Sequence, residues 1–325
     1  MSPSPDDPWE ALQIPPDSTA QEIERLTRAL ARERSLRDRT ERELEDRTRE
    51  LYFAYQRTRH HLVQLHEAER REVERLQDLL ALAKNMQAAL LPRDLWSEGL
   101  ELAAATLPCA EMGGDYYDVR PVEDGCWIGI GDVSGHGISA GLVMLMVQSI
   151  AAALIRCDRK LSPSEVLVWL NEVLFDNIRG RMGGDNYVTA SLLRFTVDGR
   201  VAFAGAHEDL IVLRAGDGRC ERVETHGAWL GVLPDIRHAC AEQQLTLGPG
   251  DLLVLHTDGM TEAMDGGGRR FGIERLCEEI ERLRGLKPQV VIERLFDRVM
   301  SFAGPPADDV TLVVIRYRGP GDGRS

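Results

Sequence analysis

The sequence predicts an α+β fold that is preceded by one long helix. Residues 17–91 contain neither glycine nor proline and are rich in Glu, Arg and Leu, which is typical of an uninterrupted helix. From Leu100 onward, short apolar segments are separated by turn residues, as in β-strands. Strands and helices come in blocks and do not alternate strictly, which favours α+β over a doubly wound parallel sheet.

The composition divides the 325 residues into four segments. Residues 1–16 are rich in Pro, Ser and Asp, and we expect them to form a disordered tail. Residues 17–92 form the predicted helix, which ends at Pro92. Residues 93–318 form the predicted α+β domain, and residues 319–325 form a second disordered tail.

The last third of the predicted helix carries an apolar seam with heptad spacing. Its members step by 3, 4, 3 and 4 residues: Leu76, Leu79, Ala83, Met86 and Leu90. A single helix of about 110 Å, at ~1.5 Å per residue, cannot bury itself and needs a partner helix or a break. We therefore expect a homodimeric coiled coil through residues 76–90. The alternative is a solvated, charged single helix with i,i+4 pairs.

Short apolar segments and longer amphipathic ones fill the predicted domain. The predicted strands are residues 100–107, 126–133, 186–195, 200–206, 210–215, 251–259 and 310–318. The predicted helices are residues 138–156, 163–178, 272–285 and 288–303.

Charge and cysteine usage exclude several function classes. The formal net charge of −14 argues against a nucleic-acid binder. The six cysteines are scattered without a C-x-x-C pair, which suits reduced thiols better than a disulfide framework or a zinc site. The N-terminus lacks the apolar core of a signal peptide, and the apolar stretch 141–155 is short for a membrane span. We therefore expect a cytoplasmic protein without membrane insertion.

Four segments place aspartates at the end of a predicted strand, beside glycine or a second aspartate. They are GGDYYD (Asp115, Asp118), GDVSGHG (Asp132), HTDG (Asp258) and DDVT (Asp308, Asp309). One such aspartate is usually a turn former. Four such segments in one domain would bring together carboxylates, which repel one another unless divalent cations lie between them. Hard oxygen ligands of this kind select magnesium or manganese.

Four longer motifs contain these segments: MGGDYYDV, IGIGDVSGHGISAGLVM, LHTDGMTEAMDGGGRRFG and ADDVTLVVI. In this order and spacing they resemble the SpoIIE-type branch of the metal-dependent (PPM, 2C-like) Ser/Thr protein phosphatases. The resemblance covers about residues 85–318 and includes AKNMQAALLP. It implies two stacked antiparallel β-sheets flanked by helices, with two Mn²⁺ or Mg²⁺ ions at one end of the sandwich.

The resemblance also implies a role for each motif residue. Asp132 would bridge the two ions, and the other ligands would be Asp115, the Val133 carbonyl, Asp258 and Asp308. Asp118 and Asp309 would not touch the ions themselves but could hydrogen-bond waters that are bound to the metals.

In this scheme a water that bridges the ions attacks phosphorus directly, without a phosphoenzyme. His136 could protonate the leaving seryl oxygen, and the alternative is that it only hydrogen-bonds within its glycine-flanked turn. No arginine lies just before Gly113, so phosphate recognition would fall to the metals and the backbone. Residues 180–186, GRMGGDN, would form a flap.

Relatives in this branch usually dephosphorylate a STAS-domain anti-sigma-factor antagonist. The resemblance therefore implies a phosphoserine or phosphothreonine phosphatase in bacterial partner switching, with a phosphorylated STAS-domain protein as substrate. A catalytically silent scaffold is one alternative, although the intact set of aspartates argues against it. A small-molecule phosphoesterase is another, and turnover of a phosphopeptide or of a metabolite would separate the two enzymes.

Overall fold

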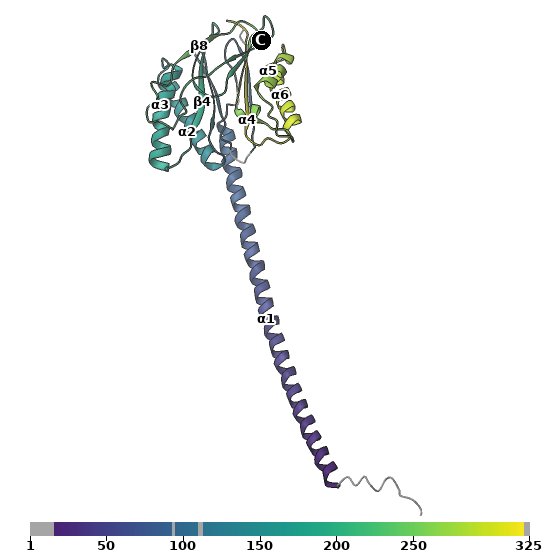
Figure 1. Cartoon of the computed structure of the whole chain (residues 1–325). Helices are drawn as coiled ribbons and strands as arrows, with labels where there is room; N and C mark the ends of the chain where they lie inside the picture. Colours follow the sequence, from purple (N-terminus) through teal and green to yellow (C-terminus); the bar gives the residue numbers. More distant parts are fainter. Residues whose placement is uncertain (1–15, 93–94, 110–112, 322–325) are drawn as a thin grey trace, which may run out of the picture. The chain divides into compact units, whose positions relative to one another are not determined.

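The computed structural model describes residues 16–92, 95–109 and 113–321. The chain divides into two compact units, Met1–Leu76 and Gln77–Ser325. Helix α1 (Pro16–Leu90) has 75 residues, so its C-terminal end belongs to the second unit (Figure 1). Most of the segment expected to be an N-terminal tail lies outside the described residues.

Two five-stranded sheets make up the second unit, and all strand pairs in them are antiparallel. The first sheet has the order β1 (Leu100–Leu107), β10 (Val310–Tyr317), β9 (Leu252–His256), β6 (Leu210–Leu213) and β7 (Cys220–Val223). The second sheet has the order β2 (Tyr116–Val122), β3 (Gly125–Val133), β4 (Val188–Thr196), β5 (Arg200–Ala206) and β8 (Gln243–Thr246).

Helices cover the outer face of each sheet (Figure 1). Helices α2 (Ile138–Cys157) and α3 (Pro163–Phe175) pack on the second sheet, and η1 (Asp176–Met182) continues α3 as a π-helix. Helices α5 (Ile273–Arg282) and α6 (Pro288–Ala303) pack on the first sheet, while the short α4 (Asp258–Glu262) follows β9. The predicted α+β fold of two stacked, helix-flanked sheets is therefore confirmed.

Apolar side chains from both sheets fill the space between them. Ile128 and Phe203 of the second sheet belong to the same buried cluster as Leu253 and Val313 of the first. Strand β10 is buried along nearly its whole length, because its other face is covered by α6. This double burial explains why its sequence, VTLVVIRY, does not alternate between apolar and polar residues.

Helix α2 is long and apolar enough to cross a membrane, and it is the one such helix in the described part of the chain. The apolar stretch 141–155, expected to be short for a membrane span, is part of a helix of 20 residues. Its buried side chains, among them Val143, Met144 and Val147, pack into the cluster beneath α3. Packing in the domain core accounts for the apolar composition of α2.

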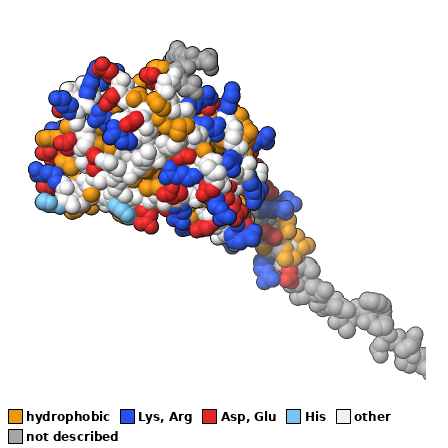
Figure 2. Space-filling model, turned by 90° about the horizontal axis from the view of Figure 1, so that it is seen from above, with side chains coloured by type: hydrophobic (Ala, Val, Ile, Leu, Met, Phe, Trp, Pro, Cys, Tyr) orange, Lys and Arg blue, Asp and Glu red, His pale blue; other side chains and the backbone are white. Residues whose placement is uncertain are grey.

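Local sequence signals set where α3 and α6 begin. Ser162 and Glu165 form a capping box at the start of α3, and Pro163 occupies its first turn. Pro288 starts α6 in the same way. On the face drawn in Figure 2, acidic and basic side chains are interspersed, so the net negative charge is not gathered there into one acidic patch.

Candidate active site

Five aspartates lie at one edge of the sandwich, where β3 and β9 end and β2 and β10 begin. Asp132 and Asp258 lie at the C-terminal ends of β3 and β9, whereas Asp115, Asp308 and Asp309 come just before β2 and β10. The expectation that every aspartate ends a strand was therefore wrong for these last three, and also for Asp118, which lies within β2. Because neighbouring strands run antiparallel, the start of one strand meets the end of the next, and all five share one edge.

Asp115 connects the two sheets at this edge. Its side chain is buried, and its Oδ2 accepts hydrogen bonds from the hydroxyls of Thr257 (2.9 Å) and Thr311 (2.5 Å). Burial raises the pKa of Asp115 well above its usual value, and the bond from Thr311 opposes this rise. Both hydroxyls bond the same oxygen. Asp115 Oδ1 has no hydrogen-bond partner among the described residues, so it remains open to another ligand.

Asp132 and Asp258 carry negative charge that their surroundings disfavour. Burial raises the pKa of Asp132 to about 7, and the charges of Asp258, Asp308 and Asp309 add to the rise. Burial and the charge of Asp308 also raise the pKa of Asp258. The carboxylates are therefore close enough to repel one another.

Asp309 organises the backbone in front of Asp115. Its Oδ1 accepts from the Cys109 amide (2.8 Å) and its Oδ2 from the Gly114 amide (3.0 Å). A Cβ at Gly113 would lie 2.4 Å from that Oδ2, so a larger residue there would displace the Asp309 carboxylate. Asp309 therefore positions the chain that carries Asp115, and its expected contact with metal waters stays a prediction.

Gly114 leaves open space beside two predicted ligand oxygens. A Cβ at this position would lie 2.8 Å from the Val133 carbonyl oxygen and 3.0 Å from Asp132 Oδ1. Both oxygens therefore face the same small volume, which a side chain would otherwise fill. This arrangement fits a site for a hard cation with oxygen ligands.

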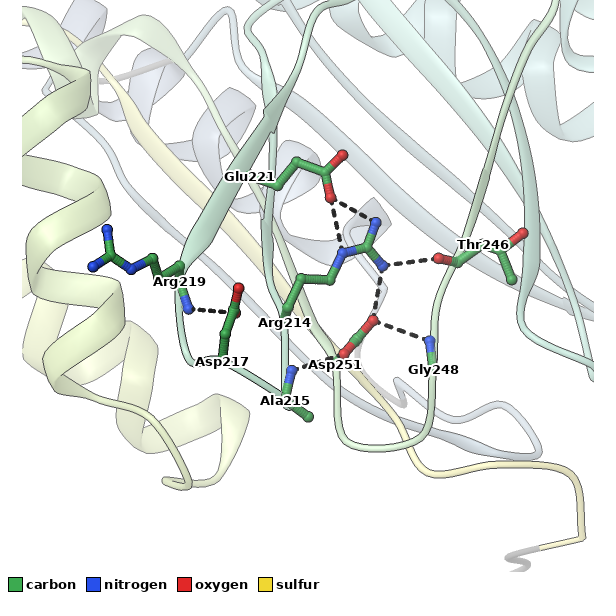
Figure 3. A network of polar contacts seen from close by, with 8 residues as sticks. All are labelled: Arg214, Ala215, Asp217, Arg219, Glu221, Thr246, Gly248 and Asp251. Atoms are coloured by element: carbon green, nitrogen blue, oxygen red, sulfur yellow. Dashed lines mark hydrogen bonds and ion pairs between the residues drawn. The ribbon is translucent and has the colours of Figure 1, made fainter.

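Two other buried aspartates of the domain have the arginine partners that the aspartates at this edge lack. Asp118 pairs with Arg120 and accepts from the Val119 amide. Asp251, at the opposite end of β9, pairs with Arg214 (2.8 Å) and accepts two backbone amides (Figure 3).

By contrast, no Lys, Arg or His forms an ion pair with the five edge aspartates in the described part of the chain: Asp115, Asp132, Asp258, Asp308 and Asp309. Asp115 and Asp309 are buried, Asp132 and Asp258 are partly buried, and Asp308 is exposed. Carboxylates withdrawn from water without a cationic partner are costly, and a divalent cation would remove that cost. Within residues 16–92, 95–109 and 113–321, no three His, Cys, Asp or Glu side chains already converge on one point as metal ligands do. Asp118, predicted as a possible outer residue, faces Arg120 and not this edge.

The turn between β3 and α2 carries His136. Gly135 and Gly137 adopt φ values of 87° and 80°, the left-handed region in which glycine is favoured. His136 is exposed and makes no hydrogen bond or ion pair with any described residue. The hydrogen bonds that hold this turn instead involve Ser134, whose amide donates to the Tyr187 carbonyl (2.8 Å).

Several residues at the site were not identified from the sequence. Thr257 and Thr311 belong to two of the quoted motifs, but their hydroxyls join Asp115 only after folding. Glu208, half-buried at the start of β6, has a pKa raised by burial and by the charge of Asp258. Gln87 of α1 bonds the backbone of Gly113. For Glu208 and Gln87 the sequence offers no motif or spacing that marks them.

Comparison with known proteins agrees with this architecture. Residues 123–318 match the family model described as Stage II sporulation protein E (SpoIIE). Over 245 residues the chain is 29% identical to "Phosphoserine phosphatase RsbU" of Bacillus subtilis (strain 168), which covers 74% of this chain and 70% of that protein.

Two solved structures share the fold. The SiaA-PP2C domain of Pseudomonas aeruginosa has a TM-score of 0.64 and 23% identity, over 75% of this chain and 98% of that one. RsbX in complex with magnesium has a TM-score of 0.51 and 11% identity, over 69% and 97% of the two chains. The family match spans more than half of the 325 residues and includes three of the four motif regions. This chain therefore belongs to the SpoIIE family of PPM-type serine/threonine phosphatases.

Proposed function

We propose that the chain hydrolyses phosphoserine or phosphothreonine on a protein at the edge formed by the five aspartates. The observation that carries this proposal is the negative charge of these aspartates, which no cationic side chain offsets in the described part of the chain. Two buried aspartates elsewhere, Asp118 and Asp251, are by contrast paired with arginines. A phosphoester is itself anionic, so this edge could bind one only when cations intervene. The charge therefore supports a cation-dependent reaction on phosphate.

Asp115 Oδ1, Asp132 Oδ1, the Val133 carbonyl, Asp258 and Asp308 would hold the ions. When bound, two Mn²⁺ or Mg²⁺ ions would activate a water and neutralise charge on the phosphoryl oxygens. The chain supplies the rest: Thr257 and Thr311 fix the Asp115 carboxylate, and Asp309 fixes the backbone at Gly114. RsbX, which shares the fold, has been crystallised with magnesium, and this favours the same class of cation.

His136 is our proposed proton donor to the leaving seryl oxygen. Its imidazole is exposed on a turn whose backbone is fixed by Ser134, so it is available to a bound substrate. A proton donor matters most for a poor leaving group such as a serine alkoxide. His136→Ala should therefore slow hydrolysis of phosphoserine more than that of p-nitrophenyl phosphate.

We further propose a phosphorylated STAS-domain protein of the same genome as the substrate, within a partner-switching pathway. The similarity to RsbU, named a phosphoserine phosphatase, supports phosphoserine as the reacting group. The exposed seam of α1 supports a homodimer, since Leu76, Leu79 and Leu90 are each about half exposed in one chain.

The decisive experiment compares substrates. The chain is incubated with MnCl₂ and either a phosphorylated STAS-domain protein or a panel of phosphorylated metabolites, and phosphate release is measured. We expect release from the phosphoprotein at a much higher kcat/KM. Release from metabolites alone would indicate a small-molecule phosphoesterase, and binding of the phosphoprotein without release would indicate a scaffold.

A further inference from the structure

An exposed aromatic pair lies beside the turn that carries His136. The rings of Tyr187 and Trp229 stack with their centroids 4.8 Å apart and their planes at 12°. Trp229 nevertheless remains 52% exposed, so one side of the stack faces solvent. The two residues flank the β-bridge between Val188 and Leu230, which places them diagonally across a strand pair.

Backbone hydrogen bonds tie this pair to the turn that carries His136. The Tyr187 amide donates to Ser134 Oγ, and the Ser134 amide donates to the Tyr187 carbonyl, both at 2.8 Å. The neighbouring Asn186 side chain donates to the Ser134 carbonyl (2.8 Å). Tyr187 is thus hydrogen-bonded directly to the residue two positions after Asp132, which links the stack to the turn beside the predicted phosphate site.

The segment that carries Trp229 is rigidly held. Asn171 of α3 accepts from the Gly231 amide (2.8 Å) and donates to the Leu233 carbonyl (2.9 Å). Arg179 of η1 donates to the carbonyls of Gly231 and Gly184 at 3.0 Å each. The π-helix η1 ends at Gly183, and such helices are frequent at functional sites.

The segments that carry the stack also expose apolar side chains. Val232 and Leu233 are 40% and 52% exposed, and Met182 at the end of η1 is 46% exposed. A rigid, uncharged aromatic surface favours an apolar side chain on its partner, since both surfaces lose water on contact. A sugar phosphate has no such group.

We propose that Tyr187 and Trp229 form a docking platform for the polypeptide around the phosphoserine, and that they select an apolar residue flanking it. This inference rests on the proposed function and deepens it, because it makes the platform a specificity determinant of the same site. The occupant is the substrate protein itself, and contact is made by the apolar side chain next to the phosphorylated residue.

The test uses the full chain with MnCl₂ and two phosphoserine peptides that differ only beside the phosphoserine, where one has leucine and the other glycine. We expect wild-type protein to favour the leucine peptide by about tenfold in kcat/KM, and Trp229→Ala to reduce this ratio to near one. Trp229→Phe should restore most of it. Trp169→Ala is the matched control, because Trp169 is equally exposed, at 52%, and within the described part of the chain has no ring contact or hydrogen bond to the turn.

Each outcome is decisive. Equal rates on the two peptides by wild-type protein, an unchanged ratio in Trp229→Ala, or an equal loss in Trp169→Ala would overturn the platform. p-Nitrophenyl phosphate reports on the proposed function separately. Failure to hydrolyse it along with both peptides would reject the phosphatase activity itself, whereas its hydrolysis without peptide selectivity would reject the platform alone.

Discussion

The side-chain amide of Gln87 makes two hydrogen bonds to the backbone of Gly113. Its Nε2 donates to the Gly113 carbonyl (2.7 Å), and its Oε1 accepts from the Gly113 amide (3.3 Å). Gln87 is 8% exposed although it lies in a helix that is otherwise largely solvent-exposed. The C-terminal end of α1 is therefore bonded to the chain two residues before Asp115, which makes the helix a support of the site.

Gln87→Leu should weaken this support. The substitution removes both hydrogen bonds, each worth about 0.5–1.5 kcal/mol, and leaves the Gly113 backbone groups unpaired. We expect kcat/KM on a phosphoprotein to fall about tenfold and the apparent Mn²⁺ affinity to fall with it. Gln77→Leu, on the exposed face of the same helix, should behave as wild type. Equal activity of Gln87→Leu and wild type would mean that the helix end has no influence on the site.

The Asp251 network should contribute to stability and not to turnover. Asp251→Asn weakens its pairing with Arg214 and should lower the free energy of unfolding by about 1–3 kcal/mol. Asp217 is drawn beside this network but is exposed, and among the described residues its one hydrogen bond comes from the Arg219 amide (Figure 3). Asp217→Asn should therefore cost less than about 0.5 kcal/mol. Urea unfolding measures the free energy of unfolding of both variants. An equal loss of stability in the two would contradict a structural role for the Asp251 network.

Buried histidines should make stability depend on pH. Burial lowers the pKa of His207 to about 3 and that of the neighbouring His256 to about 4, so both stay neutral in the folded chain. The unfolded chain binds protons below about pH 6.5, so stability is full above that value and is lost as the pH falls. Between pH 6.5 and 5 the loss of stability from His207 should be about 1.6 kcal/mol.

His207→Asn isolates this contribution. Asparagine preserves a hydrogen-bonding group for Thr189, which contacts His207 Nδ1 at 2.9 Å, but does not titrate. The free energy of unfolding of the variant should depend less steeply on pH than that of wild type. Comparison of the two proteins cancels the opposing contribution of the raised carboxylates at the site. His238→Asn, at an exposed position, is the control, and parallel curves for wild type and His207→Asn would contradict the prediction.

The seam on α1 remains a prediction of dimerisation. Leu79→Lys combined with Leu90→Lys would place two charges in a buried interface, and we expect a monomer by light scattering. Ala81→Lys with Ala88→Lys introduces the same charge on the exposed face of the helix, away from the seam, and should leave the dimer intact. A parallel fall in phosphatase rate would show that the coil acts on the site as well as holding two chains together. An unaltered dimer in the seam variant would show that the seam was misread.

Much of the fold was predictable because its signals are local. The glycine- and proline-free segment gave α1, and runs such as LLVLH and VTLVVIRY gave β9 and β10. Strands β2, β7 and β8 were missed. β7 and β8 have four residues each and expose polar side chains, while β2 contains a proline and a buried ion pair. Pairing with neighbouring strands, and not their own sequence, stabilises these three.

The site was only partly predictable for a similar reason. The aspartates lie in motifs, so their meeting at one edge could be expected from the resemblance. The contacts that hold Asp115 join residues 142 and 196 positions apart, and no spacing in the sequence reveals them. The same holds for Gln87 and Gly113, and for the Arg120 partner that turns Asp118 away from the edge.

The central claim is that the edge aspartates act by holding divalent cations, and one measurement tests it most directly. Phosphate release from a phosphoserine protein is followed for wild type, Asp132→Asn, Asp258→Asn and the surface control Asp124→Asn, each after chelation and after addition of MnCl₂ or MgCl₂. We predict no turnover by chelated wild type, recovery with either metal, and a loss of at least about 100-fold in the two site variants despite added metal. Metal-free Asp132→Asn should also unfold at a slightly higher temperature than metal-free wild type, because repulsion among the carboxylates is relieved. Full turnover by the chelated protein, or near-normal rates in Asp132→Asn, would contradict the account.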